Sequence, residues 1–241
     1  MRLKTRLRHW LRETVGVDVR RWPHPETLVG HLVRLLRATG VDCVLDVGAN
    51  VGQFAASLRA AGFAGDLVSI EPAPEPFAAL ARRAARDPRW HALRMAVGEA
   101  PGEGTLQLSG SSTIASLLPM EAWYRAEHPR GAAAGEVTVP IRPLDWALVE
   151  GVLGRRPVRL CLKSDTQGYE AKVLAGATEI LPAAEVVQVE LSVRPVYVGA
   201  PDWRAMIDRL AELGFDLAGI FPVAYDRRLS VIELDGVFRR R

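Results

Sequence analysis

The sequence predicts an α/β protein with a doubly wound, mostly parallel sheet. Apolar, β-branched segments of strand length alternate with Ala- and Leu-rich segments of helix length along most of the chain. The first strand, at 43–47, leads directly into a glycine turn and a helix at 53–61, the unit from which such sheets are built. Hydrophobic residues make up 49% of the chain, enough to cover a sheet on both faces.

The later elements continue this alternation. A strand at 67–71 and a helix at 74–86 form the second unit, and a third strand is expected at 92–97. Segments 105–108 and 136–141 alternate apolar and polar residues, which favours two accessory strands. The remaining predicted elements are strands at 158–163, 185–191 and near 215–220 and 230–235, with helices at 168–175 and 202–213.

The 241 residues are expected to form one main domain. No linker, repeat or low-complexity segment divides the chain, so we assign this domain to 41–241 and an N-terminal helical extension to 1–40. Within the domain, 109–135 breaks the pattern with a Ser/Thr cluster, aromatic residues and a Gly/Ala run. It is predicted to be a lid or substrate loop, and a plain surface excursion is the alternative.

The glycine turn at 48–52 predicts a ligand site at the start of a helix. A dinucleotide fingerprint is not met, because Asn50 takes the place of its second glycine, and Asp46 would repel a phosphate. Glu71 ends the second strand, where an acidic side chain binds ribose hydroxyls in nucleotide folds. Together these features favour an aminoacyl nucleoside, most commonly S-adenosylmethionine. Alternatively, Asp46 caps the helix and Glu71-Pro72 is an ordinary strand exit.

Four motifs in order carry a resemblance to a known family. They are Asp46-Val-Gly-Ala-Asn-Val-Gly-Gln-Phe54, Glu71-Pro72, the block Leu162-Lys-Ser-Asp-Thr-Gln-Gly-Tyr-Glu170 with Val173-Leu174 and Gly176-Ala177, and Val189-Glu190. With them the chain resembles the FkbM family of S-adenosylmethionine-dependent methyltransferases. The first motif is shared by many class I methyltransferases, and the block is more specific. The chain departs from the family at Gln167, where members often carry glutamate.

This resemblance implies a Rossmann-like class I methyltransferase sheet that ends in an antiparallel hairpin, and S-adenosylmethionine as the methyl donor. It also implies that residues beside the glycine turn, the second strand and the adenine ring bind the cofactor. The candidates are Asp46, Gly48, Ala49, Asn50, Gly52, Phe54, Glu71, Pro72, Met95, Ala96, Val97 and Asp165.

Methyl transfer to an alcohol requires alignment of the acceptor and a base that removes its proton. Asp165 is the candidate base, Lys163 would orient it or the acceptor oxygen, and Glu190 is a second carboxylate. Alternatively, Lys163 and Asp165 form a structural ion pair and Asp165 caps the next helix. A third option is that Asp165 and Glu190 bind Mg²⁺. His128 stands alone and is expected to be a surface residue.

The acceptor implied by the resemblance is a hydroxyl of a sugar, a glycan or a secondary metabolite. A polar cluster followed by aromatic residues suits a saturated hydroxylated ring, with Trp123 or Tyr124 stacking on its apolar face. The candidate acceptor residues are Ser112, Trp123, Tyr124, Arg194 and Tyr197. The alternative functions are an NAD(P)-linked oxidoreductase and a non-catalytic partner subunit with a methyltransferase fold.

The net charge of +3 is unevenly distributed, because basic residues concentrate in 1–22 and 239–241 and leave the body acidic. This argues against a nucleic-acid partner. Leu3, Leu7, Trp10 and Leu11 repeat at helical spacing among the basic residues. We expect this helix to pack on its own domain or on a second copy in a homo-oligomer, with a membrane surface as the alternative.

Two cysteines, Cys43 and Cys161, lie in apolar strands and are expected to be buried free thiols. The N-terminus lacks the apolar core of a secretory signal, and no segment has the apolar length of a membrane span. These features predict a cytoplasmic location.

Overall fold

The computed structural model describes residues 10–17, 22–109, 115–128 and 133–241. Its main sheet has seven strands in the order β3-β2-β1-β7-β8-β10-β9. These strands are β1 (Cys43–Val47), β2 (Asp66–Ile70), β3 (Trp90–Leu93), β7 (Leu160–Ser164), β8 (Ala184–Ser192), β9 (Phe215–Tyr225) and β10 (Val231–Arg240). In this sheet β10 runs opposite to the other strands and pairs antiparallel with β8 and β9, so the predicted mostly parallel sheet with a closing antiparallel hairpin is confirmed.

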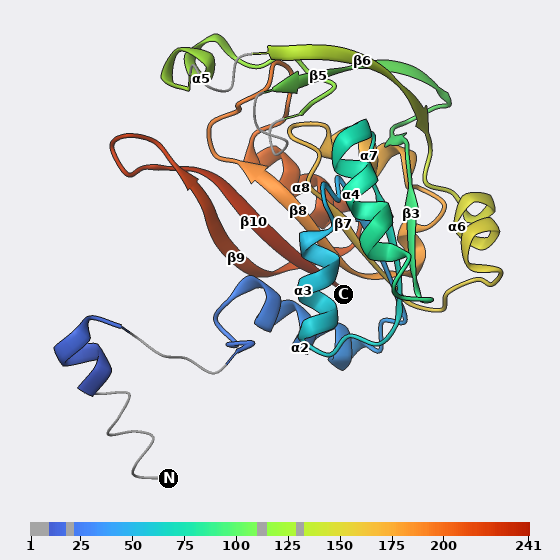
Figure 1. Cartoon of the computed structure of the whole chain (residues 1–241), viewed down its shortest axis with the longest axis horizontal. Coiled ribbons are helices and arrows are strands. Elements are labelled where there is room, and N and C mark those ends of the chain that lie inside the picture. Colours follow the sequence, from blue (N-terminus) through green and yellow to red (C-terminus); the bar gives the residue numbers. More distant parts are fainter. Residues whose placement is uncertain (1–9, 18–21, 110–114, 129–132) are drawn as a thin grey trace.

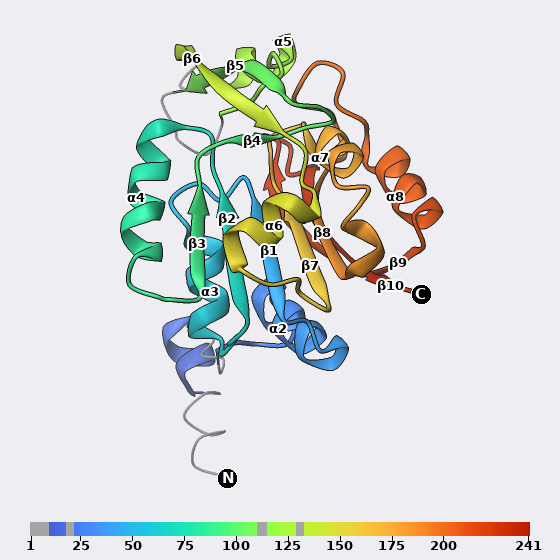
Figure 2. The same cartoon turned by 90° about the vertical axis from the view of Figure 1, so that its right-hand side faces the viewer.

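Helices cover both faces of this sheet (Figure 2). One face packs against α2 (Leu28–Thr39), α3 (Gln53–Ala60) and α4 (Pro74–Ala84), and the other against α6 (Trp146–Leu153), α7 (Glu170–Gly176) and α8 (Trp203–Glu212). Successive residues of a strand point to opposite faces of the sheet, so Val44 lies in the core with α2, α3 and α4, and Leu45 lies in the core with α6, α7 and α8. A short 3-10 turn, Leu181–Ala183, precedes β8.

One of these helices was not predicted, and another lies in the predicted N-terminal helical extension. Helix α6 is absent from the prediction; it begins where the Asp145 side chain accepts a hydrogen bond from the Leu148 N–H, and it buries Val149. Helix α2 lies within the predicted extension 1–40, and its buried Leu32 and Leu36 belong to the core on one face of the sheet.

A second, three-stranded sheet lies across the end of the main sheet toward which β3 points (Figure 2). It consists of β4 (Ala96–Val97), β5 (Gly102–Ser109) and β6 (Ala133–Arg142), in the order β4-β6-β5. The two predicted accessory strands are confirmed as the antiparallel pair β5 and β6. The single strand predicted at 92–97 is wrong: β3 ends at Leu93, where its pairing with β2 ends, and β4 pairs with β6 instead.

The segment between β5 and β6 carries α5 (Ala122–Glu127), which lies beside this second sheet (Figure 1). Ser112 lies outside the described residues, as do Leu3 and Leu7 of the predicted N-terminal helix. A helical turn at Leu11–Val15 stands apart from the domain in Figure 1, and Trp10 beside it is 54% exposed.

Both cysteines are buried and free, as predicted. Among the described helices, none is long and apolar enough to cross a bilayer.

Candidate functional site

A row of buried polar side chains crosses three strands beneath the glycine turn. Asp46 on β1 is in register with Lys163 on β7 and with Ser69 on β2. The Lys163 ammonium lies 2.9 Å from Asp46 Oδ1, and Ser69 Oγ donates to Asp46 Oδ2 at 3.2 Å. Burial lowers the pKa of Lys163, but the carboxylates of Asp46 and Asp165 outweigh it, so the pKa is raised overall. Lys163 therefore remains a buried cation.

Lys163 also holds the glycine turn. Its Nζ donates to the carbonyl oxygens of Gly48, at 2.9 Å, and Val47, at 3.4 Å. Gly48 has a φ of 74°, and a Cβ there would lie 1.8 Å from the carbonyl oxygen of Asp165. The turn thus packs directly against the loop after β7, which only glycine permits. Asn50 adopts a φ of 50°, a left-handed conformation that asparagine tolerates better than most residues.

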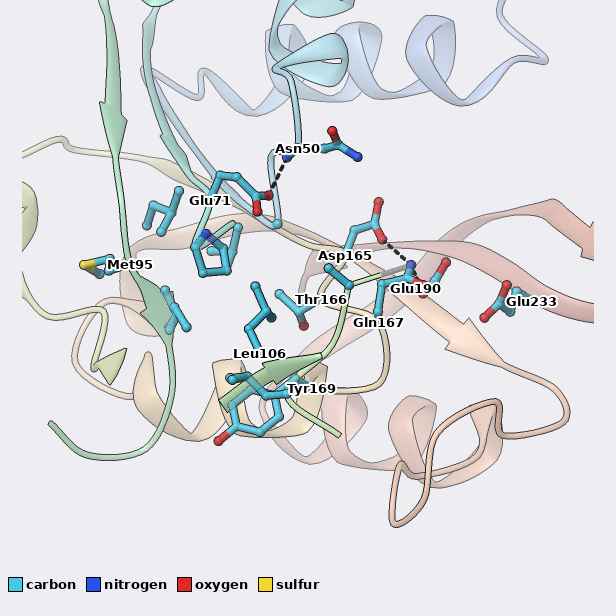
Figure 3. Close-up of a pocket in the computed structure, with 18 of the residues that line it drawn as sticks. Asn50, Glu71, Met95, Leu106, Asp165, Thr166, Gln167, Tyr169, Glu190 and Glu233 are labelled. Carbon is cyan, nitrogen blue, oxygen red and sulfur yellow. Dashed lines mark hydrogen bonds between the residues drawn. The ribbon is translucent and has the colours of Figure 1, made fainter. Parts of the chain in front are cut away.

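A cavity of about 330 Å³ opens at the carboxyl ends of β1, β2, β7 and β8, beneath the second sheet. This volume lies within the range of small-molecule sites. Figure 3 shows Met95 toward one end, Glu233 toward the other, and Glu71 and Asp165 between them. Of the predicted site residues, those lining the cavity are Gly48, Asn50, Glu71, Pro72, Met95, Ala96, Val97, Tyr124, Asp165 and Glu190.

Glu71 connects the glycine turn to the exit of β2. One carboxylate oxygen accepts the Asn50 backbone N–H at 2.8 Å, and the other accepts the Ala73 N–H at 2.8 Å. Burial raises the pKa of Glu71, and the two backbone donors oppose this effect. Each oxygen keeps a further lone pair for a ligand, because a carboxylate accepts about four hydrogen bonds.

Gln167 joins the two candidate catalytic carboxylates. Its Nε2 donates to Asp165 Oδ1 and to Glu190 Oε2, both at 3.1 Å, and its Oε1 accepts the Tyr197 hydroxyl at 2.9 Å. Its backbone has a φ of 57°, which is uncommon for a residue of this type, and its carbonyl accepts the Ser116 hydroxyl at 2.6 Å. Gln167, the position at which this sequence departs from the FkbM pattern, therefore links several elements of the site through its hydrogen bonds.

Further carboxylates lie near this pair. Glu233, on β10, lines the cavity beside Glu190, and burial followed by repulsion from Asp165 raises its pKa to about 7. Burial and neighbouring carboxylates raise the pKa of Glu190 well above its ordinary value. Asp235 is also shifted, chiefly by burial, to a pKa of about 6. One end of the cavity is thus strongly acidic.

Several predicted site residues lie outside the cavity lining, namely Asp46, Ala49, Gly52, Phe54, Lys163, Trp123, Arg194 and Tyr197. These residues contact neighbouring groups of the protein. A Cβ on Gly52 would meet Leu80 and Trp90, and the Phe54 ring lies 5.5 Å from the Lys163 ammonium. Gly52 and Phe54 therefore pack around the turn and do not line the cavity.

Of the two aromatic residues of α5, Tyr124 lines the cavity and Trp123 does not. Trp123 donates from Nε1 to the Pro195 carbonyl at 3.0 Å, and the Arg194 guanidinium lies 3.6 Å from the centre of its ring. Tyr124 lines the cavity and stacks on His128 at 4.3 Å, so His128 contacts the site indirectly. Trp123 and Arg194 anchor α5, whereas Tyr124 faces the ligand space.

Some cavity residues were missed, including Leu106, Thr166, Tyr169 and Glu233. Thr166 and Tyr169 lie in the Leu162–Glu170 motif, so their closeness in sequence to Asp165 could have identified them as cavity residues. Glu233 reaches the site because β10 pairs with β8, placing it opposite Ser192. No local sequence feature indicates that pairing.

Within the described residues, no group of three or more His, Cys, Asp or Glu side chains is arranged to hold a metal ion. The Gln167 amide donates to both Asp165 and Glu190. This amide accounts for the pairing of the two carboxylates in the structure.

Comparison with known proteins gives a family match, and the matching solved structures include the following two. Magnesium protoporphyrin IX methyltransferase (ChlM) from Synechocystis PCC 6803, solved with bound SAM, is 11% identical, with coverage of 99% of this chain and 97% of that one and a TM-score of 0.49. Precorrin-6y C5,15-methyltransferase from Geobacter metallireducens is 8% identical over 89% of this chain and 87% of that one, with a TM-score of 0.46. No curated protein matches significantly.

The family match rests on the sequence itself. The profile of the methyltransferase FkbM domain matches residues 46–217, a span that begins at Asp46 and includes the whole Lys163 block. This span covers more than half of the chain and runs from the end of β1 to the start of β9. The chain therefore belongs to the FkbM methyltransferase family.

Proposed function

We propose that this protein transfers a methyl group from S-adenosylmethionine to a hydroxyl of a sugar, a glycan or a secondary metabolite. The observation that carries the proposal is one cavity holding Glu71 at the end of β2 and Asp165 just beyond the end of β7. Family membership supports methyl transfer over the hydride transfer of an oxidoreductase.

The residues that line the cavity suit the donor in polarity and charge. Glu71 has free lone pairs for ribose hydroxyls, and the apolar atoms of Met95, Ala96 and Val97 offer contacts for an adenine ring. Among the described residues that line the cavity, none is basic and four are acidic, which suits a donor bearing a sulfonium and an ammonium. The bound donor supplies an electrophilic methyl carbon.

Asp165 is the carboxylate best placed to act as base. Its side chain is 37% exposed, whereas Glu190 is buried, so an acceptor hydroxyl can reach Asp165 more readily. Gln167 fixes one of its oxygens, and the Lys163 ammonium lies 3.6 Å from the other. In this proposal Asp165 takes the hydroxyl proton as attack proceeds, and Lys163 is a positioning residue.

The test is methyl transfer from labelled S-adenosylmethionine to a panel of hydroxylated acceptors, with donor affinity measured in parallel by calorimetry. Asp165→Asn keeps an oxygen that accepts from Gln167 but removes the base. We expect kcat to fall by about 10²- to 10⁴-fold, with the donor Kd changed far less. Unchanged kcat would rule out Asp165, and absence of donor binding would overturn the proposed function. We expect EDTA to leave the rate unchanged.

A further inference from the structure

The acidic end of the cavity contains a buried carboxylate that the protein leaves without a partner. Glu233 is 7% exposed and lines the cavity next to Glu190. Among the residues that the structure describes, none donates a hydrogen bond to its side chain or forms an ion pair with it. Burying an uncompensated charge is costly. Because this carboxylate faces the ligand space, a ligand can provide the missing partner.

The surroundings indicate that this partner is a cation. The described residues lining the cavity include no lysine, arginine or histidine, so Glu233 and Glu190 face no positive protein group there. Tyr124 lines the same cavity, and its pKa is raised first by burial and then by the charges of Glu233 and Glu190. Two carboxylates beside an aromatic ring form a favourable site for an ammonium group.

The donor's own ammonium does not account for this site. Glu71 and the apolar contacts at 95–97 define the end for the nucleoside, and the glycine turn and Asp165 follow (Figure 3). Glu233 lies beyond Asp165, on the side away from Met95 (Figure 3). A second cationic group, carried by the acceptor, would reach it.

A divalent metal is the less favoured cation. The described residues offer no cluster of three metal-ligating side chains, and the Gln167 amide already donates to both Asp165 and Glu190. An ammonium has three donors and needs no fixed coordination polyhedron, so Glu190 and Glu233 together suffice for it.

We propose that Glu233 and Glu190, with Tyr124, form a subsite for a protonated amine of the acceptor, so that the substrate is an amino alcohol such as an amino sugar. This inference rests on the proposed function, because it assumes that the acceptor occupies the space beyond Asp165. It adds to the proposed function the requirement that the hydroxylated acceptor also carries a positively charged amine.

The test measures binding to the full protein loaded with S-adenosylhomocysteine, by NMR titration near neutral pH. The probes are glucosamine, glucose and N-acetylglucosamine, which share a ring but differ in the charge of one substituent. We expect glucosamine to bind at least about tenfold more tightly than either neutral sugar, a difference of about 1.4 kcal/mol. Glu233→Gln preserves size and should remove this preference, and Glu190→Gln should weaken it.

Glu212→Gln, at the exposed end of α8, removes a carboxylate far from the cavity and should leave the preference intact. The affinity for S-adenosylhomocysteine should be the same in Glu233→Gln and the wild type, which shows that the variant is folded. Equal binding of the three sugars, binding of none, or binding of glucose only with added MgCl₂ would overturn the amine subsite. Failure to bind S-adenosylhomocysteine would instead overturn the proposed function.

Discussion

Glu71 has two tasks that a neutral side chain cannot perform together. Its two oxygens accept the N–H groups of Asn50 and Ala73 while facing the nucleoside end of the cavity. In Glu71→Gln, an NH₂ group would face one of these donors. We expect the Kd for S-adenosylmethionine to rise by about 10- to 100-fold, a loss of about 1.4 to 2.8 kcal/mol, as measured by calorimetry.

The matched control for this prediction is Glu75→Gln in the exposed first turn of α4, close in sequence but outside the cavity. Its donor affinity should equal that of the wild type. If Glu71→Gln bound the donor equally well, the assignment of Glu71 to the ribose would be wrong.

Gln167 shows how one uncharged amide can stabilise two neighbouring carboxylates by donating a hydrogen bond to each. In Gln167→Glu, a third carboxylate would replace the donor that now joins Asp165 and Glu190. Because an unmatched buried charge costs several kcal/mol, we expect a marked fall in Tm at about pH 8. The fall should be smaller at low pH, where protonation restores a donor. Thermal unfolding at both pH values measures this effect.

Gln107→Glu provides the control, because the Gln107 amide also donates to a carboxylate, that of Glu136, but in an exposed position. Solvent screens the new charge pair there, so its effect on Tm should be small. Comparable effects at the two positions would show that Gln167 has no special role.

At the scale of elements, the block that begins at Leu162 in β7 mainly shapes the loop that follows this strand. Lys163 holds the glycine turn, and a Cβ on Gly168 would lie 2.8 Å from Tyr197. Glu170 accepts the N–H and the hydroxyl of Thr166, at 2.7 and 3.0 Å, and so closes the turn into α7. Asp165 is thereby held at the cavity by contacts on both sides of it.

The contact between Gly48 and this loop gives the next prediction. In Gly48→Ala, the added methyl would overlap the Asp165 carbonyl and would also require a positive φ. We expect a loss of stability of at least about 2 kcal/mol and a donor affinity lowered by more than about tenfold. Chemical unfolding and calorimetry measure these two changes.

Gly102→Ala, at the start of β5, is the control because a Cβ there meets nothing within 4 Å. Its stability should stay close to that of the wild type. Normal donor binding in Gly48→Ala would mean that the turn can move away from Asp165 without cost.

Local patterns were enough to place β1, the glycine turn and Glu71, because all three lie within one strand–turn–helix unit and the strand after it. They did not reveal that Asp46 pairs with Lys163 and lies outside the cavity lining, since that follows from the register between β1 and β7. They also missed Glu233, whose position depends on antiparallel pairing with β8. The sequence predicted what neighbouring residues determine and missed what long-range pairing determines.

At the scale of the whole molecule, acidic groups collect at the ligand end of the sheet although the chain is basic overall. Burial, reinforced by neighbouring carboxylates, raises the pKa values of Glu170 and Glu233 to about 7 and that of Asp235 to about 6. The folded protein without ligand therefore binds more protons than the unfolded chain in weakly acidic solution. Its stability is therefore coupled to the protonation of carboxylates in and near the cavity.

This coupling predicts how stability changes with pH. Between about pH 4.5 and 7 the folded state retains protons that the unfolded chain has lost, so the free energy of unfolding should fall as pH rises. Glu233→Gln removes one contributor. Since one pKa unit is worth about 1.4 kcal/mol, we expect this variant to have a Tm at least about 3 °C higher than the wild type at about pH 8, and nearly equal at about pH 4.5. Glu212→Gln should follow the wild-type profile, and identical profiles for Glu233→Gln and the wild type would mean that Glu233 is solvated in the free protein.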